Sequence, residues 1–146
     1  MVEDDIVVTP NFLKYILGAL EFYENQKSIF CVSGFSFPLI KGNYEYDSMV
    51  VSRFSSYGWA SWSNRVEEVK WTKNELIGIM ESSNGFKKRL NSEGYDLHRM
   101  LKKQISGEIS TWDIQMQVHV SENRLKVIFP VISKTMNIGF DGESTN

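Results

Sequence analysis

Cysteine is almost absent from this sequence, since Cys31 is the single one among 146 residues. A lone cysteine excludes an internal disulfide, and it argues against a structural zinc site, which uses several cysteine or histidine ligands. Cys31 lies in the apolar run SIFCVSGF. We therefore expect a buried, unreactive thiol rather than a functional one.

Long hydrophobic runs and an excess of one charge are absent as well. No apolar stretch approaches the length of a membrane span, and the acidic start lacks the character of a signal peptide. With 16 basic and 18 acidic residues the formal net charge is -2, which argues against broad electrostatic binding to nucleic acid or an anionic membrane. We expect a soluble, intracellular segment, which could still belong to a longer or membrane-associated protein.

The spacing of apolar residues predicts a mixture of helices and strands. Phe12–Tyr23 has apolar residues at helical intervals, with Thr9 or Asn11 as the cap. The segments SIFCVSGF, SMVVSRF and LKVIFP have the composition of strands. The stretch 63–107 is polar and helical, and it ends at Gly107.

Two further patterns complete the prediction of the fold. Apolar and polar residues alternate in IQMQVHV, which predicts a strand from Ile114 to Val120. The tail NIGFDGESTN reads as a glycine-rich loop. At 42% hydrophobic, the chain is long enough for one domain with its own core. Strands mixed with helices predict an α/β or α+β fold.

Three consecutive carboxylates, Glu3, Asp4 and Asp5, stand just before the apolar run that begins at Ile6. The apolar flanks indicate a partly buried strand end, where unpaired carboxylates are costly because desolvation penalises the charged form. Adjacent carboxylates there can offer oxygen ligands to Mg²⁺ or Mn²⁺, which often bridges carboxylates to a diphosphate. The structural alternative is that these acids are solvated or lie at a helix N-terminus.

The stretch SSYGWASWSNR combines glycine, aromatic and basic residues. Gly58 lets the backbone approach a neighbour or a ligand closely, and Trp59 and Trp62 offer flat faces to a ring. Arg65 can donate charge-assisted hydrogen bonds to a phosphate or a carboxylate. The alternative is a tightly packed turn with Arg65 in a structural ion pair.

In the stretch STWDIQ, Asp113 follows Trp112. A carboxylate in a partly apolar cleft has a raised pKa, which suits a general base. A surface acid or a helix cap is the simpler alternative for a single aspartate.

Taken in order, these motifs resemble bacterial sugar transferases with the glycosyltransferase A fold, of the kind common in Bacteroidetes. That family is distantly similar to the animal N-acetylglucosaminyltransferase that initiates complex N-glycans. The matching stretches are VEDDIVVTPNFL, CVSGFSFP, SSYGWASWSNRV, GYDLHRMLKKQISG, STWDIQ and PVISKTMNIGFDG. The resemblance covers nearly the whole chain. It implies an α/β fold with a mixed sheet and flanking helices, in which residues 1–146 form one partial domain, the acceptor-side, catalytic half.

The resemblance also implies a function. It is the inverting, metal-dependent transfer of a sugar from a nucleotide-diphosphate sugar to a hydroxyl group of a glycan acceptor, as in polysaccharide biosynthesis. Asp5 corresponds to the ligand of Mn²⁺ or Mg²⁺, with Glu3 and Asp4 nearer the nucleotide and the donor sugar. Asp113 corresponds to the general base.

Further binding residues follow from the same resemblance. Those on the donor-sugar and acceptor side are Gly58, Trp59, Trp62 and Arg65. Ser133 and the NIGFDG loop, which contains Gly139, correspond to the segment that closes over the donor.

The chain departs from the family pattern at several positions. Tyr57 replaces a tryptophan, Val66 replaces the tryptophan after the motif's arginine, and the ending Ser144-Thr145-Asn146 replaces Gly-Thr-His, so a diphosphate-contacting histidine is missing. The resemblance also predicts a helix over residues 114–120, against the strand that alternation predicts.

The strands that hold the nucleotide base and ribose precede the acidic motif in such a fold, whereas Met1 lies two residues before it. We therefore expect a truncated enzyme that lacks its N-terminal Rossmann-like half and is inactive without it. Its uncovered sheet edge would favour self-association.

The implied partners are a nucleotide-sugar donor and a glycan acceptor, without nucleic acid. The implied location is the cytoplasm. The inner face of the membrane, in a membrane-associated pathway, is the other location that the resemblance allows. Two alternatives stay open. One is a non-catalytic remnant that binds carbohydrate or protein through residues 57–62, and the other is a structural α/β domain with solvated acids.

Overall fold

The computed structural model describes residues 1–37, 44–82 and 85–139. Its helices and strands are, in chain order, β1 (Ile6–Val8), α1 (Phe12–Tyr23), β2 (Ile29–Ser33), β3 (Ser48–Val51), β4 (Trp59–Ser61), α2 (Ser63–Val66), α3 (Lys73–Ser82), α4 (Phe86–Glu93), α5 (Leu97–Ser106), α6 (Asp113–Glu122), β5 (Lys126–Pro130) and β6 (Thr135–Asn137).

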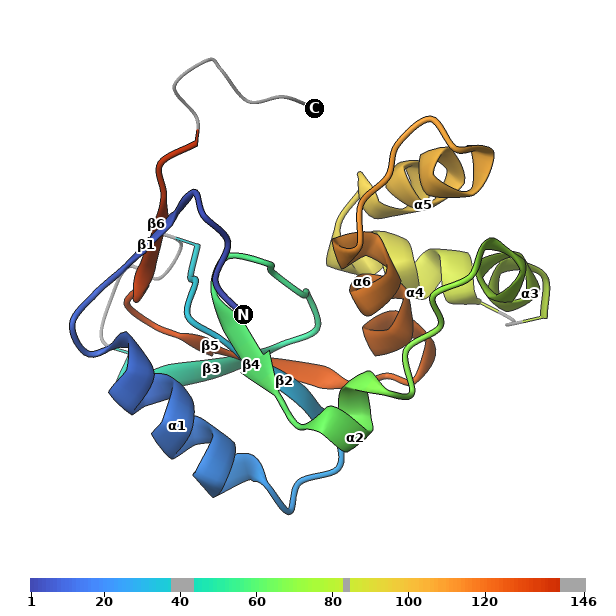
Figure 1. Cartoon of the computed structure of the whole chain (residues 1–146). Coiled ribbons are helices and arrows are strands. Elements are labelled where there is room, and N and C mark those ends of the chain that lie inside the picture. The colour runs from blue at the N-terminus through green and yellow to red at the C-terminus, as the bar shows by residue number, and fades with distance from the viewer. Residues whose placement is uncertain (38–43, 83–84, 140–146) are drawn as a thin grey trace.

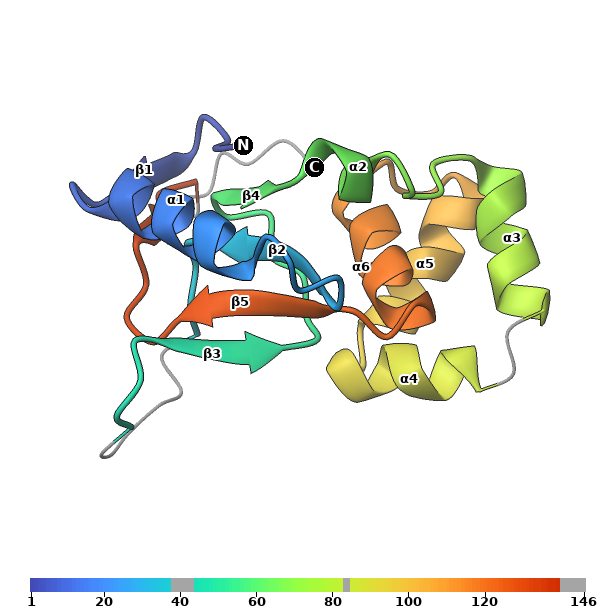
Figure 2. The ribbon, with the colours of Figure 1, turned by 90° about the horizontal axis from the view of Figure 1, so that it is seen from below.

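The main sheet is mixed. Its strand order is β3-β5-β2-β4, with β2 and β5 parallel and the other pairs antiparallel. A separate antiparallel ribbon joins β1 to β6. Helices flank the sheet on both sides, and α3 to α6 gather beyond one end of it (Figures 1 and 2). The predicted α/β class, with a mixed sheet and flanking helices, is therefore confirmed.

The two faces of the sheet bury different helices. On one face, Ile29, Val32 and Ile128 pack against Phe12 and Ile16 of α1. On the other face, Met116 and Val120 of α6 pack with residues of the sheet, which include Phe30, Cys31, Val127 and Phe129. Side chains in a strand alternate between faces, which is why neighbours in β5 join different cores. The expected burial of Cys31 is confirmed, because none of its surface is exposed.

Helix α6 overturns the strand that alternation predicts for residues 114–120, and it agrees with the helix that the family resemblance implies. Residues two apart on a helix point about 200° away from each other, whereas residues four apart share a side. Ile114 and Val118 therefore pack against α3, α4 and α5. Met116 and Val120 pack against the sheet. Alternation here reports a helix buried on two opposite sides.

Other local predictions agree with the structure to different degrees. The helix Phe12–Tyr23 is confirmed, and Asn11 occupies its N-cap position without a side-chain capping bond. Helix α5 ends at Gly107, which adopts the left-handed conformation with φ 82°. Strand β6 extends into the predicted tail loop as far as Asn137. Residues 140–146, including the NIGFDG loop beyond Gly139, lie outside the described part of the chain.

Arg65 is buried and ties α2 to the sheet. Its guanidinium group donates hydrogen bonds to the backbone carbonyls of Ile29 (2.7 Å) and Glu24 (2.5 Å). The same group lies 3.5 Å from the centre of the Trp62 ring, in a cation–π contact. Arg65 therefore joins the end of α1, the start of β2 and the start of α2.

Replacement of Arg65 by methionine should lower the free energy of unfolding by on the order of 2–3 kcal/mol, because a buried carbonyl loses its donor. Urea denaturation measures this change. Arg99→Met, on the exposed side of α5, is the matched control and should change stability by less than about 0.5 kcal/mol. Equal effects of the two substitutions would contradict the role of Arg65.

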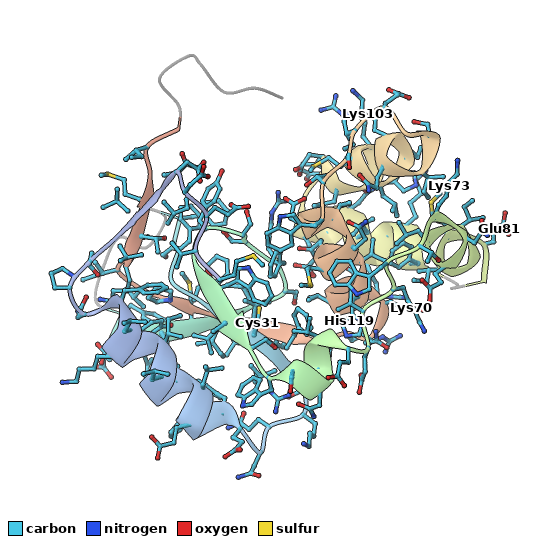
Figure 3. The ribbon with its side chains drawn as sticks, in the orientation of Figure 1. Cys31, Lys70, Lys73, Glu81, Lys103 and His119 are labelled. Carbon is cyan, nitrogen blue, oxygen red and sulfur yellow. The ribbon has the colours of Figure 1, made fainter. Side chains whose placement is uncertain are left out.

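His119 of α6 is buried against the Phe30 ring, and Figure 3 shows it between the sheet and the helical side. Burial lowers the pKa of the folded imidazole below its usual 6.5. The unfolded chain therefore binds the proton more readily, so this contribution to stability is complete above pH 6.5 and is lost as the pH falls below it.

The free energy of unfolding of the wild type should fall when the pH is lowered from about 7.5 to 5.5, and His119→Gln should make this fall smaller. Urea denaturation at both pH values measures the difference. The pKa of His98 is also lowered, but both proteins contain His98, so their difference isolates His119. Identical pH dependence in the two proteins would show that the buried ring does not drive it.

Candidate functional site

The acidic residues lie in a turn before β1 rather than at the end of a buried strand. The Ile6 N–H donates to the Glu3 carbonyl (3.2 Å), and the Asp5 carbonyl accepts from Ile138 (2.9 Å). Asp4 is exposed, while Glu3 and Asp5 are half-buried. A turn keeps three adjacent carboxylates partly in water, which avoids the desolvation cost of a buried strand end.

Glu3 lies near two other carboxylates, those of Asp5 and Asp113. Its pKa is raised by burial first and then by the negative charge of Asp5, with a smaller contribution from Asp113. The side chains of Trp112 and Ser56 partly oppose this shift because they favour the ionised form. The fold has therefore brought Asp113 close enough to the N-terminal turn for their charges to interact.

Tyr57, in the loop before β4, lies near the same three carboxylates. Burial raises the pKa of its phenol, and so do the charges of Asp5, Glu3 and Asp113. We call the group formed by Glu3, Asp5, Tyr57 and Asp113 the acidic site. Two of its members, Asp5 and Asp113, are those that the sequence predicts as metal ligand and general base.

Asp113 occupies the first turn of α6, where the helix dipole favours a negative charge. Its Oδ1 accepts a hydrogen bond from the Thr111 hydroxyl. A cavity of about 40 Å³ lies beside it, lined also by Leu97 and Met100 of α5. Such a volume holds a water molecule and not a sugar, so a sugar acceptor would have to approach Asp113 from the open surface.

Asp5 is held in place by β6. Its Oδ2 accepts a hydrogen bond from the Asn137 side-chain amide (2.9 Å), and Asn137 Oδ1 in turn accepts from the Gly139 N–H (2.7 Å). Gly139 is in close contact with Asp5, because a Cβ atom there would lie 3.0 Å from Asp5 Oδ2. Within residues 1–37, 44–82 and 85–139, Asp5 Oδ2 accepts the hydrogen bond from Asn137 and Asp5 Oδ1 accepts none, which leaves one carboxylate oxygen for a ligand.

Among the described residues, no three His, Cys, Asp or Glu side chains are arranged to hold a metal ion. The donor set fits a hard cation that takes one oxygen from Asp5 and the remainder from a bound diphosphate and water, as Mg²⁺ commonly does.

The two tryptophans of the aromatic motif lie on opposite faces of the sheet. Trp59 is 6% exposed and stacks on Trp112, with ring centres 5.8 Å apart. Trp62 packs on the α1 side, against the Arg65 guanidinium group. Positions three apart in an extended chain point to opposite sides, so the structure does not bring Trp59 and Trp62 together. Trp59 has little surface left for a ligand.

Gly58 is close to protein atoms. Its φ is +74°, and a Cβ atom there would lie 2.7 Å from the Thr135 methyl group and 3.2 Å from the Phe12 ring. Packing of β6 and α1 is therefore enough to require glycine at this position.

The other predicted binding residues are spread between the site and the scaffold. Ser133 accepts a hydrogen bond from the Ser36 N–H (3.2 Å) and donates one to the Thr135 carbonyl (2.7 Å). Arg65 is engaged with backbone carbonyls, as described above. Of these residues, only Gly139 adjoins the acidic site.

The sequence predicts no role for Ser56, and it includes Asn137 and Tyr57 only as members of the NIGFDG loop and of residues 57–62. Asn137 begins the NIGFDG motif, and Ser56 and Tyr57 directly precede Gly58. Their position at the edges of these motifs is the sequence feature that could have identified them as site residues. Their contribution depends on how β6 and the loop before β4 meet the N-terminal turn.

No protein-family model matches the chain, and no curated protein matches it in sequence. In the part of the chain that the structure describes, none of the helices has both the length and the apolar character needed to cross a membrane.

Glu3→Gln should increase the free energy of unfolding at neutral pH, because it removes a carboxylate whose folded pKa lies above the usual 4.5. The wild-type carboxylate is protonated at low pH, so the gain should shrink near pH 4. Solvent screens the repulsion, and the gain should stay below about 1 kcal/mol. Urea denaturation at both pH values tests this.

Asp4→Asn makes the same change of charge at the exposed neighbour and is the control for Glu3→Gln. A gain of equal size in Asp4→Asn would indicate general charge reduction and not the acidic site.

Proposed function

We propose that this chain carries the catalytic carboxylates of a sugar transferase with the glycosyltransferase A fold. The reaction is transfer of a sugar from a nucleotide-diphosphate donor to a hydroxyl group of a glycan acceptor. The observation that supports it most is the convergence of Asp5 and Asp113, which are 108 positions apart in the sequence, around Glu3 and Tyr57.

Asp113 would act as the general base. Its carboxylate takes the proton from the acceptor hydroxyl as the oxygen attacks the anomeric carbon of the donor, on the face opposite the leaving diphosphate. Thr111 holds one carboxylate oxygen by hydrogen bonding, which orients the group. A positioned base of this kind contributes about 10²–10⁴-fold to the rate.

Asp5 would hold the cation, with Asn137 fixing the plane of its carboxylate. A bound Mn²⁺ or Mg²⁺ supplies charge neutralisation at the departing diphosphate. The like charges of Glu3, Asp5 and Asp113 also provide a reason for cation binding, because a cation relieves their mutual repulsion.

A non-catalytic carbohydrate-binding or protein-binding role is the competing proposal. It depends on residues 57–62 forming an exposed aromatic surface. The burial of Trp59 and the placement of Trp62 on the other face of the sheet leave this role with less support.

Binding of Mn²⁺ together with a nucleoside diphosphate tests the proposal. In the presence of UDP or GDP, we expect Mn²⁺ to broaden the NMR amide signals of residues 3–6 and 137–139. Asp5→Asn should abolish this broadening, and Asp47→Asn, at an exposed position before β3, should retain it, although both remove one negative charge.

Transfer to glycan acceptors from a panel of nucleotide sugars, measured on the full-length protein that contains this chain, tests the base. Asp113→Asn should lower the rate by about 10²–10⁴-fold while Mn²⁺ broadening is unchanged. Equal activity of Asp113→Asn and the wild type would reject Asp113 as base. Glycan binding that persists without metal and in Asp5→Asn, with no broadening by Mn²⁺, would favour the non-catalytic role.

A further inference from the structure

Positive charge is concentrated in one part of the chain. Residues 85–107 contain six of the 16 lysines and arginines but only two of the 18 acids. All six lie on α4 and α5, and five of them have exposed side chains: Lys87, Lys88, Arg99, Lys102 and Lys103. The net charge of -2 for the whole chain therefore hides a locally basic region.

Packing of α4 against α5 brings these cations together. Phe86 and Leu90 of α4 and Leu97 and Leu101 of α5 are buried in the helical core, which leaves the lysines on the outer side. Burial lowers the pKa of His98, and the charges of Lys87 on α4 and Lys102 on α5 lower it further. Cations from both helices thus surround one histidine.

Acidic residues leave much of this charge unneutralised. Asp96 pairs with Arg53 at 2.9 Å, and Lys103 lies 4.0 Å from Glu108. Figure 3 shows Lys103 on the outer side of α5. In the described ranges 1–37, 44–82 and 85–139, no ion pair involves Lys87, Lys88 or Lys102. We call these three lysines the basic face.

A shallow depression of about 740 Å³ adjoins the basic face. Its lining includes Lys87, Lys88, Ser92 and Tyr95, and one acid, Glu93. Tyr95 is 96% exposed, and an exposed tyrosine next to lysines suits the boundary between water and lipid headgroups. The depression is large enough to receive a headgroup between the lysines.

The basic face is also remote from the acidic turn. Figure 2 shows α4 at the lower right and the N-terminal end of the chain at the upper left. An anionic surface on α4 and α5 would therefore lie away from Glu3, Asp4 and Asp5, which would repel it.

We propose that the basic face and Tyr95 form a docking surface for an anionic phospholipid bilayer. Charge complementarity carries this assignment, together with the exposed Tyr95 beside the lysines. The inference goes beyond sugar transfer and does not depend on it. Such docking would hold the protein at a membrane by its surface, without a membrane-spanning helix.

Sedimentation with vesicles tests the proposal on the intact chain. The protein should bind vesicles made of equal parts phosphatidylglycerol and phosphatidylcholine at roughly 0.05 M salt, and binding should be lost at roughly 0.5 M, because salt screens these charges. Vesicles of phosphatidylcholine alone should bind poorly. The double variant Lys87→Gln with Lys102→Gln should lower the partition coefficient by about 25-fold, near fivefold for each charge.

The matched control is Lys14→Gln with Lys27→Gln, which removes the same charge from exposed positions on α1 and the turn after it. It should leave binding within about twofold of wild type. A rise in the pKa of His98 in the first variant, followed by NMR, together with unchanged urea denaturation, would verify that the lysines were removed from a folded face.

Three results would overturn the proposal. One is absence of binding to the anionic vesicles at low salt, and another is an equal loss of binding in the Lys14 and Lys27 variant. The third is retention of the protein by an RNA oligonucleotide but not by vesicles, which would assign the basic face to nucleic acid.

Discussion

Burial of α6 on two opposite sides is the constraint on which the rest of the structure depends. One side of the helix, with Met116 and Val120, closes the core over the sheet. The other, with Ile114 and Val118, supplies the apolar surface on which α3, α4 and α5 assemble. Neither the sheet nor the helical group would have a complete core without this helix, because each uses one of its sides.

The polar residues of α6 make this double burial tolerable. Gln117 accepts from the Phe54 N–H (2.7 Å) and donates to the Ser52 carbonyl (3.0 Å), so its buried amide is satisfied. These bonds also fix the segment that leads to Ser56 and Tyr57. The same helix presents Asp113 in its first turn, and its packing therefore determines where the acidic site forms.

Charge is separated across the molecule in a way that matches the two proposals. The acidic site has like charges in close range, and a cation would relieve their repulsion. The basic face on α4 and α5 lies on the helical side, where lysines from two helices face water. Attraction of an anionic bilayer to that face would leave the acidic site away from the lipid, open to a soluble donor.

The amino-acid sequence by itself determined the parts of the structure that depend on neighbouring residues. The helix Phe12–Tyr23, the buried strand around Cys31 and the end of α5 at Gly107 all follow from local spacing and the conformational freedom of glycine. The acidic motif could be recognised as candidate chemistry in the same way.

Only the tertiary structure decided what depends on distant residues. Alternation in residues 114–120 is compatible with a strand or with a helix buried on two sides, and the packing partners select the helix. The approach of Asp5 and Asp113 to the same Glu3 and Tyr57, and the separation of Trp59 from Trp62 by the sheet, arise from contacts between remote segments. Local periodicity contains no information about such contacts, because it reports only which side of an element is apolar.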